Sequence, residues 1–167
     1  MSVFVATSSL LFLLALPLTR SYPNYVPAEA CERMTPGHHP FKPQTKCSPF
    51  EVIVSQESIV AGSSVAVNIT GRQYHEGFMV QAKDVDSGAV IGFWDVGKNN
   101  TLAKPMTCWS QDDTVTHTNE DHKNKVSVLW NAPADYNGTA VFKATVVKRF
   151  NLFWVGITSD PLTVTYG

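Results

Sequence analysis

The sequence predicts an all-β protein, an immunoglobulin-like antiparallel β-sandwich, and three observations support this prediction. About eight short segments are rich in β-branched and aromatic residues, and several alternate apolar with polar side chains. Turn residues such as Gly62, Gly71 and the pair Asp160-Pro161 separate these segments. No segment repeats its apolar residues with the period of a helix. Together these patterns are typical of one two-layer β domain.

The first 21 residues are similar to a secretory signal peptide. An apolar run, densest over residues 10–18, is followed by Thr19, Arg20 and Ser21 at the expected cleavage region. This run is shorter than the ~20 apolar residues that a membrane-spanning helix needs. We therefore expect cleavage after Ser21 and a secreted product without a membrane span. Residues 22–167 fit one domain of the usual size, roughly 100–200 residues.

The expected elements follow each other along the chain. Residues 22–49 are rich in proline and are expected to run as an extended coil over the surface. Residues 74–94 are predicted to form a central hairpin, because two apolar runs flank the turn residues 86–88. The other predicted strands are 51–55, 64–70, 125–130, 139–148, 150–157 and 162–166.

Four further features complete this prediction. Asn137-Gly138 is a typical hairpin turn, and residues 98–124 form a long loop with little periodicity. Trp130 is expected to anchor the core at the end of its strand, since Pro133 stops the ladder. A core position is also favoured, over an exposed binding patch, for the aromatic run Phe150, Phe153 and Trp154.

The three cysteines are Cys31, Cys47 and Cys108, and their odd number leaves one over if a disulfide forms. Secretion favours disulfides. We prefer Cys31–Cys108, which would tie the N-terminal segment to the body of the domain. The rival pair Cys31–Cys47 would close a short proline-rich loop and stays open at this point. With the preferred pair, Cys47 is a buried free thiol or links two chains, so the protein is a monomer or a Cys47-linked dimer.

Charge and motifs argue against several classes of function. The formal net charge is −1, so no basic field attracts nucleic acid or anionic membranes. The acidic pairs at 112–113 and 120–121 match no calcium loop. Neither a nucleophile motif nor a phosphate-binding loop is present. Zinc spacings are also missing among the histidines, which are His38, His39, His75, His117 and His122. We therefore expect no catalytic residue, no metal and no cofactor.

Three N-glycosylation sequons begin at Asn68, Asn99 and Asn137. Asn99 lies in the predicted long loop and Asn137 in a predicted turn. Asn68 lies within a predicted strand, so its side chain must face solvent to be modified. Secretion would make all three sequons usable, and each is a predicted glycosylation site.

Several separated motifs, taken in order, resemble the reeler domain family. They are Ala30-Cys31, residues 34–38, GFMVQAKD, IGFW, the loop around Cys108, residues 128–133, Gly138 with residues 141–147, and residues 153–155. The resemblance covers nearly all of residues 22–167. It implies an immunoglobulin-like sandwich and a single reeler domain, it favours Cys31–Cys108 as the disulfide, and it supplies no catalytic residues.

A signal peptide followed by one reeler domain is similar to the secreted insect defence proteins, including the noduler-like proteins of haemolymph. This resemblance implies a role in innate immunity, with binding to microbial surfaces or blood cells and antimicrobial activity in response to infection. It leaves the ligand-binding residues unknown. One alternative is an extracellular-matrix or cell-adhesion module, as in reelin and the spondins. Another is an accessory module of an oxidoreductase, as in ferric-chelate reductase-like proteins.

Overall fold

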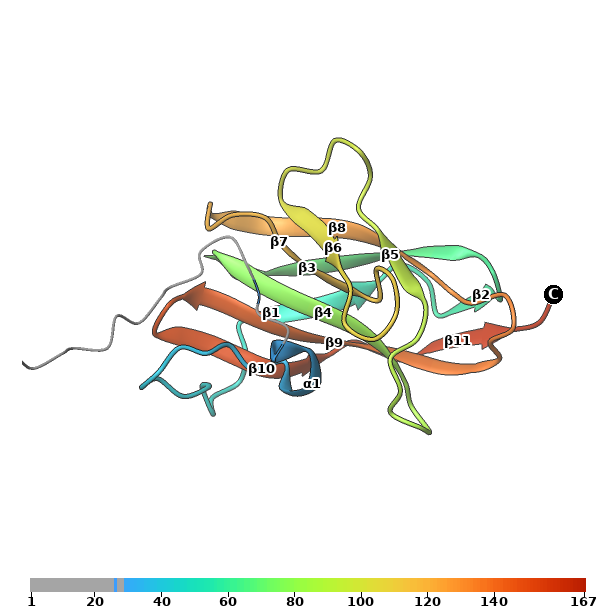
Figure 1. Cartoon of the computed structure of the whole chain (residues 1–167), viewed down its shortest axis with the longest axis horizontal. Coiled ribbons are helices and arrows are strands. Elements are labelled where there is room, and N and C mark those ends of the chain that lie inside the picture. The colour runs from blue at the N-terminus through green and yellow to red at the C-terminus, as the bar shows by residue number, and fades with distance from the viewer. Residues whose placement is uncertain (1–25, 27–28) are drawn as a thin grey trace, which may run out of the picture.

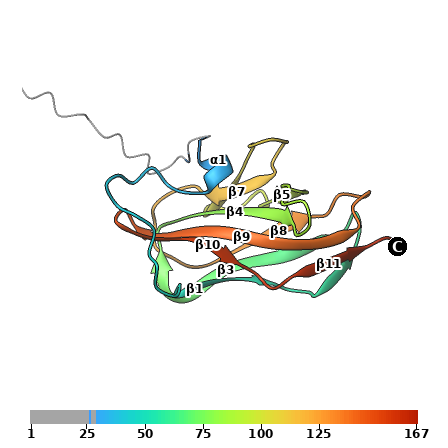
Figure 2. The same cartoon turned by 90° about the horizontal axis from the view of Figure 1, so that it is seen from below.

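The structure is a computed structural model, and it describes residue 26 and residues 29–167. The predicted signal peptide lies outside the described residues. Two β-sheets face each other and enclose one apolar core (Figures 1 and 2). The smaller sheet has the strand order β1-β3-β8-β5, and the larger has the order β2-β11-β9-β4-β7-β6, with β10 paired to β9. The predicted all-β sandwich is confirmed.

The strands of each sheet come from distant parts of the chain. The smaller sheet contains β1 (Phe50–Val54), β3 (Ser64–His75), β5 (Phe93–Asp95) and β8 (Lys123–Asn131). The larger sheet contains β2 (Ser58–Val60), β4 (Gly77–Asp84), β6 (Ala103–Met106), β7 (Thr114–His117), β9 (Gly138–Arg149), β10 (Leu152–Thr158) and β11 (Leu162–Thr165). The β2–β11 pair is parallel, whereas β4, β7, β9 and β10 pair in antiparallel fashion.

Alternating apolar residues fill the space between the sheets. In β3 the buried apolar side chains are Val65, Val67 and Ile69, while their neighbours in sequence face outward. Trp130 of β8 is fully buried, and its indole N–H donates a hydrogen bond to the Ile91 carbonyl at 3.0 Å. Trp130 is therefore the core anchor that its position in the sequence predicts.

The predicted central hairpin is correct only near its turn. Lys83 and Val90 form a bridge across the turn, and the Ser87 amide donates to the Asp84 carboxylate at 2.8 Å. The return run then leaves the larger sheet, and β5 pairs with β8 in the smaller one. This crossover places Trp94 between the sheets, where it is 2% exposed and contacts Phe142 with ring centroids 5.7 Å apart. Burial of this indole explains the change of sheet.

Two other sequence-based expectations are wrong. The predicted long loop at 98–124 contains the strands β6 and β7. In β7, residues 114–116 are all buried, so the strand lacks the alternation that would reveal it. The pair Asn137-Gly138 does not turn a hairpin, because it lies between β8 of the smaller sheet and β9 of the larger sheet. The short strand β2 also went unpredicted.

A short N-terminal helix adds a third layer on the outer face of β4 (Figure 2). This helix, α1 (Ala30–Arg33), packs Ala30 and the following Met34 against Met79. The Gln81 side-chain amide donates to the Cys31 carbonyl at 3.0 Å, and the Thr145 hydroxyl donates to the Met34 carbonyl. Residues 77–82 of β4 are therefore buried on both faces.

Residues 34–49 contain no helix or strand, as predicted, and follow β10, whereas α1 was not predicted in the segment 22–49. The Gln44 amide donates to the Phe153 carbonyl at 2.9 Å, and the Trp154 indole donates to the Lys46 carbonyl at 3.2 Å. These contacts hold the segment on the surface, so Cys47 is exposed. The expectation of a buried Cys47 thiol is therefore wrong. No helix among the described residues is long and apolar enough to cross a membrane.

Candidate functional site

A disulfide joins the N-terminal layer to the loop between β6 and β7. Cys31 of α1 bonds to Cys108, with their Cα atoms 5.6 Å apart. This is the preferred pairing, and the rival pair Cys31–Cys47 is excluded because Cys47 is free. The loop over residues 107–113, called the Trp109 loop here, is thereby attached covalently to α1.

One buried carboxylate organises the Trp109 loop. Asp113 is 1% exposed and accepts hydrogen bonds from the backbone N–H groups of Cys108, Trp109 and Ser110 at 2.8–2.9 Å. Its Oδ1 also accepts from the Thr114 hydroxyl at 3.1 Å. Hydrogen bonds to a carboxylate are stronger than those between neutral groups, so this set rigidifies the loop.

The core side of the same loop is held by Trp94. The Trp94 indole donates to the Asp113 carbonyl at 3.1 Å, and the Trp94 backbone N–H donates to the Asp112 carbonyl at 2.8 Å. Asp112 has a positive φ of 55°, a conformation that favours glycine or Asn and Asp. Both backbone and side-chain contacts therefore fix the path of the loop.

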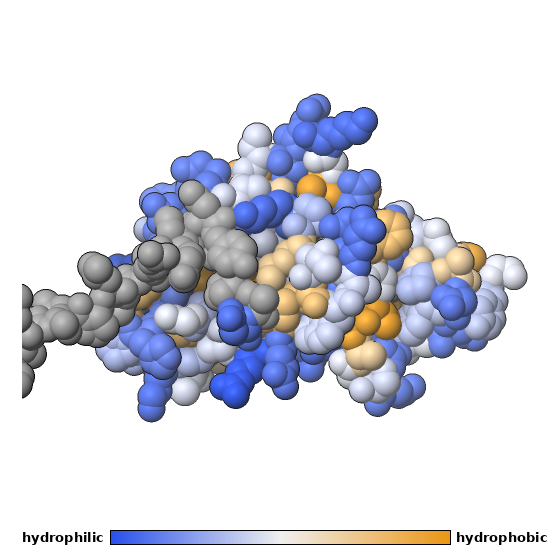
Figure 3. Space-filling model, in the orientation of Figure 1, coloured by the Kyte–Doolittle hydropathy of each residue, from blue (hydrophilic) through white to orange (hydrophobic). Residues whose placement is uncertain are grey.

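Trp109 projects from this fixed loop and is 58% exposed. A hollow of about 340 Å³ lies beside it, lined by Glu32, Lys83, Gly88, Ala89, Val90 and Trp109. These residues come from α1, from β4, from the turn after β4 and from the Trp109 loop. The face of the molecule that carries α1 shows small apolar patches among hydrophilic residues (Figures 1 and 3). The hollow and Trp109 form the candidate binding site.

The sequence singled out neither Trp109 nor the hollow. The available signal was local, because Trp109 directly follows a disulfide cysteine and Asp113 lies four residues later. The aromatic run near 150–154, considered as a patch, is mostly internal. Phe153 is fully buried and Trp154 is partly buried, as expected for core. Phe150 at the β9–β10 turn is 43% exposed, so the core interpretation is wrong for this residue.

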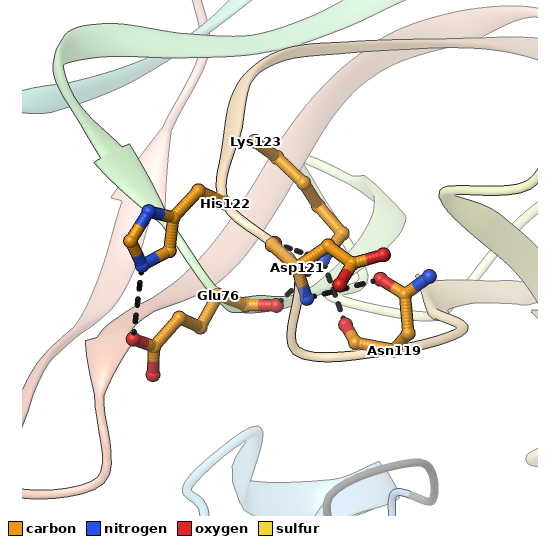
Figure 4. A network of polar contacts seen from close by, with 5 residues as sticks. All are labelled: Glu76, Asn119, Asp121, His122 and Lys123. Carbon is orange, nitrogen blue, oxygen red and sulfur yellow. Dashed lines mark hydrogen bonds and ion pairs between the residues drawn. The ribbon is translucent and has the colours of Figure 1, made fainter.

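A second polar cluster surrounds Lys123 at the start of β8 (Figure 4). The Lys123 ammonium donates to the carbonyls of Glu76, Asn119 and Asp121 at 2.7–2.8 Å. An ammonium has three N–H donors, so these bonds saturate it. Burial lowers the pKa of Lys123, against the opposing effect of nearby carboxylates. This cluster closes the β7–β8 loop and leaves Lys123 no donor for a ligand.

The five histidines are not brought together as metal ligands. His75 is buried in the core, His38 packs on Phe150, and His39 is exposed. His122 stacks on Tyr74 with centroids 3.7 Å apart, and its Nε2 lies 3.7 Å from a Glu76 carboxylate oxygen. Within residues 29–167, no group of three or more His, Cys, Asp or Glu side chains is arranged to hold a metal ion.

The three sequon asparagines lie on the surface. Asn99 and Asn137 are exposed outside the strands. Asn68 lies on the outer face of β3, half-buried, where its register partners are Ile53 and Ser127. All three side chains therefore satisfy the requirement that an acceptor asparagine lie outside the core.

Comparison with known proteins gives consistent matches over most of the chain. A family model described as "Reeler domain" matches residues 29–167. "Putative defense protein 3" of Antheraea mylitta is 37% identical over 153 residues, which is 90% of this chain and 91% of that protein. "Putative ferric-chelate reductase 1 homolog" of Drosophila melanogaster is 32% identical, over 87% of this chain but 23% of that protein.

The fold comparison agrees. The crystal structure of a human F-spondin reeler domain superposes with a TM-score of 0.61 at 17% identity, covering 75% of this chain and 95% of that one. An identity this low shows the shared fold alone. The family match over residues 29–167 and the relatives above 30% identity go further. The chain belongs to the reeler domain family.

Proposed function

We propose that this chain is a secreted defence protein of innate immunity, which recognises microbial surfaces or blood cells by binding and catalyses no reaction. The observation that supports binding is an exposed tryptophan, Trp109, held on a rigid loop beside a hollow. Several relatives named putative defense proteins support the defence role. Antimicrobial activity in response to infection would follow from this recognition.

The geometry of the Trp109 loop favours binding for an entropic reason. A loop that is already ordered loses little conformational entropy when it meets a ligand. Tryptophan supplies a large contact area with only two side-chain torsions to fix. Because the chain carries a formal net charge of −1, contact area rather than bulk charge would dominate the affinity.

The remaining features of the proposal concern processing and assembly. Cleavage after Ser21 would release residues 22–167, one reeler domain, into the haemolymph. Glycans at Asn68, Asn99 and Asn137 would decorate its surface. The exposed thiol of Cys47 is accessible to a second chain, so the secreted form is a monomer or a Cys47-linked dimer.

Co-sedimentation tests the proposed function directly. Glycosylated residues 22–167 are mixed with washed bacteria, fungal cells and blood cells, and viable microbes are counted in the same samples. Binding with loss of viability identifies an antimicrobial effector, and binding without killing identifies a recognition factor. If the protein sediments with none of these cells but binds matrix preparations, the proposal fails and the cell-adhesion alternative takes its place.

A further inference from the structure

Trp109 differs from the other tryptophans of the described chain. Trp94 and Trp130 are 2% and 0% exposed, and Trp154 is partly buried against the core cluster, whereas Trp109 is 58% exposed. The Trp109 loop is nevertheless held by the disulfide and by the Asp113 carboxylate. Covering a large apolar ring that is exposed to water lowers the free energy of the complex, so an exposed ring on a rigid loop favours ligand binding.

The polar side chains beside Trp109 include one hydrogen-bond acceptor and one hydrogen-bond donor. Glu32 offers a carboxylate acceptor and Lys83 offers an ammonium donor, and both line the hollow. Within residues 29–167, neither side chain takes part in an ion pair. Their charges cancel, so the hollow does not favour a strongly anionic or cationic ligand. A ligand with hydroxyl groups can donate to Glu32 and accept from Lys83 at the same time.

We propose that this hollow binds one pyranose ring of a neutral oligosaccharide. The apolar C–H face of the ring packs on the Trp109 indole, and ring hydroxyls bond to Glu32 and Lys83. This ligand class rests on the proposed function, since it makes a surface glycan the feature that the protein recognises. The volume of about 340 Å³ is at the low end of ligand pockets, which range from about 300 to 1,000 Å³. One ring therefore fits while the rest of the chain extends into solvent.

Soluble laminarihexaose and chitohexaose are the probes for a direct test, with acrylamide quenching of tryptophan fluorescence as the readout. Trp109 is the most exposed of the four tryptophans, so a bound ring should protect the quenchable part of the signal saturably. Affinity is then measured by calorimetry for each variant. We expect Trp109→Ala to weaken binding by about tenfold or more, as removal of a central aromatic contact does.

Matched variants distinguish binding in the hollow from nonspecific binding elsewhere on the surface. Glu32→Gln and Lys83→Gln should each weaken binding several-fold, because each removes one charged hydrogen-bond partner. Tyr166→Ala is the control, since Tyr166 is 60% exposed and lies at the C-terminus. Its affinity should equal that of the wild type. Equal affinity of Trp109→Ala and wild type for both oligosaccharides would overturn the assignment of the site.

The two proposals fail in different ways. If wild type and Trp109→Ala sediment equally with cells, the site is wrong while the proposed function stands. If wild type binds the oligosaccharides through Trp109 but sediments with no cell, the site stands and the proposed function fails. An excess of soluble laminarihexaose or chitohexaose should compete with the cells and reduce sedimentation. If protease treatment of the cells abolishes sedimentation and neither oligosaccharide competes, the occupant is a protein and the carbohydrate proposal is overturned.

Discussion

His75 lies in the core at the end of β3, and neither ring nitrogen has a hydrogen-bond partner in the described part of the chain. Its ring meets Phe50 and Phe78 edge-on, with centroids 5.7 and 6.0 Å away. Burial, and then the electrostatic effects of Lys123 and His117, lowers the pKa of His75 from 6.5 to about 4. The residue is therefore neutral in the folded protein at physiological pH.

This burial predicts that acid destabilises the fold through His75. Below pH 6.5 the unfolded chain binds a proton at this residue while the folded chain does not, so stability falls until about pH 4. Between pH 7.5 and 5 the free energy of unfolding should drop by about 2 kcal/mol from this residue. Urea unfolding of His75→Phe at these two pH values should show a drop in unfolding free energy about 2 kcal/mol smaller than that of the wild type. The control His39→Phe, at an exposed histidine, should show the same drop as the wild type.

Lys123 carries a second prediction at the scale of one residue. Lys123→Met keeps the apolar stem but removes the three hydrogen bonds to main-chain carbonyls. Loss of these partners should lower the free energy of unfolding by about 1–3 kcal/mol. Thermal melting measures this loss, and Lys125→Met, at an exposed position of the same strand, is the control. Equal melting temperatures of Lys123→Met and the wild type would contradict this prediction, because they would show that water can replace the ammonium with no loss of stability.

Among the elements, the Trp109 loop depends most on one side chain. Asp113→Asn keeps the shape of the side chain but replaces charged hydrogen bonds and turns one acceptor into a donor. Stability should fall by about 1–3 kcal/mol. Hydrogen exchange at the amides of Cys108, Trp109 and Ser110 should become faster than in the wild type. If exchange at these amides is unchanged, the carboxylate is not what orders the loop.

The disulfide should stabilise the third layer formed by α1. Replacing both Cys31 and Cys108 by Ser removes a link between positions 77 residues apart and should cost about 2–5 kcal/mol of unfolding free energy. Differential scanning calorimetry provides the measurement. Cys47→Ser, at an exposed free cysteine, should melt as the wild type does. A double variant that melts unchanged would mean that noncovalent contacts alone hold α1.

Strand positions followed from the sequence where apolar and polar residues alternate, and they did not follow where this alternation is missing. The alternation in β3 and β8 predicts both strands, because each has one core face. β7 was missed because it is covered on both faces, and the crossover after the 86–88 turn depends on where Trp94 is buried. The candidate site joins α1, β4 and the Trp109 loop. These segments are distant in the sequence, and the pairing of β4 with β7 and the disulfide bring them together.

For the whole molecule, the positions of the sequons predict where glycans lie. Asn99 and Asn137 are exposed outside the strands, and Asn68 is on the outer face of the smaller sheet, whereas the hollow lies against the larger sheet. A glycan at Asn68 should therefore leave the hollow open. Mass spectrometry of secreted protein before and after enzymatic deglycosylation should locate glycans at these asparagines. Asn99→Gln should remove one glycan. Its affinity for the oligosaccharides should stay within about twofold of the wild-type affinity, well below the tenfold change that corresponds to about 1.4 kcal/mol.

The attachment of α1 beside the candidate site has a practical consequence for labelling. A tag or fluorophore joined directly ahead of residue 29 would begin within a few residues of Glu32, which lines the hollow. The C-terminus lies at one end of the molecule, beyond β11 and away from α1 (Figure 1). Immobilisation through the C-terminus therefore keeps the support away from α1, whereas immobilisation directly ahead of residue 29 places the support close to the hollow.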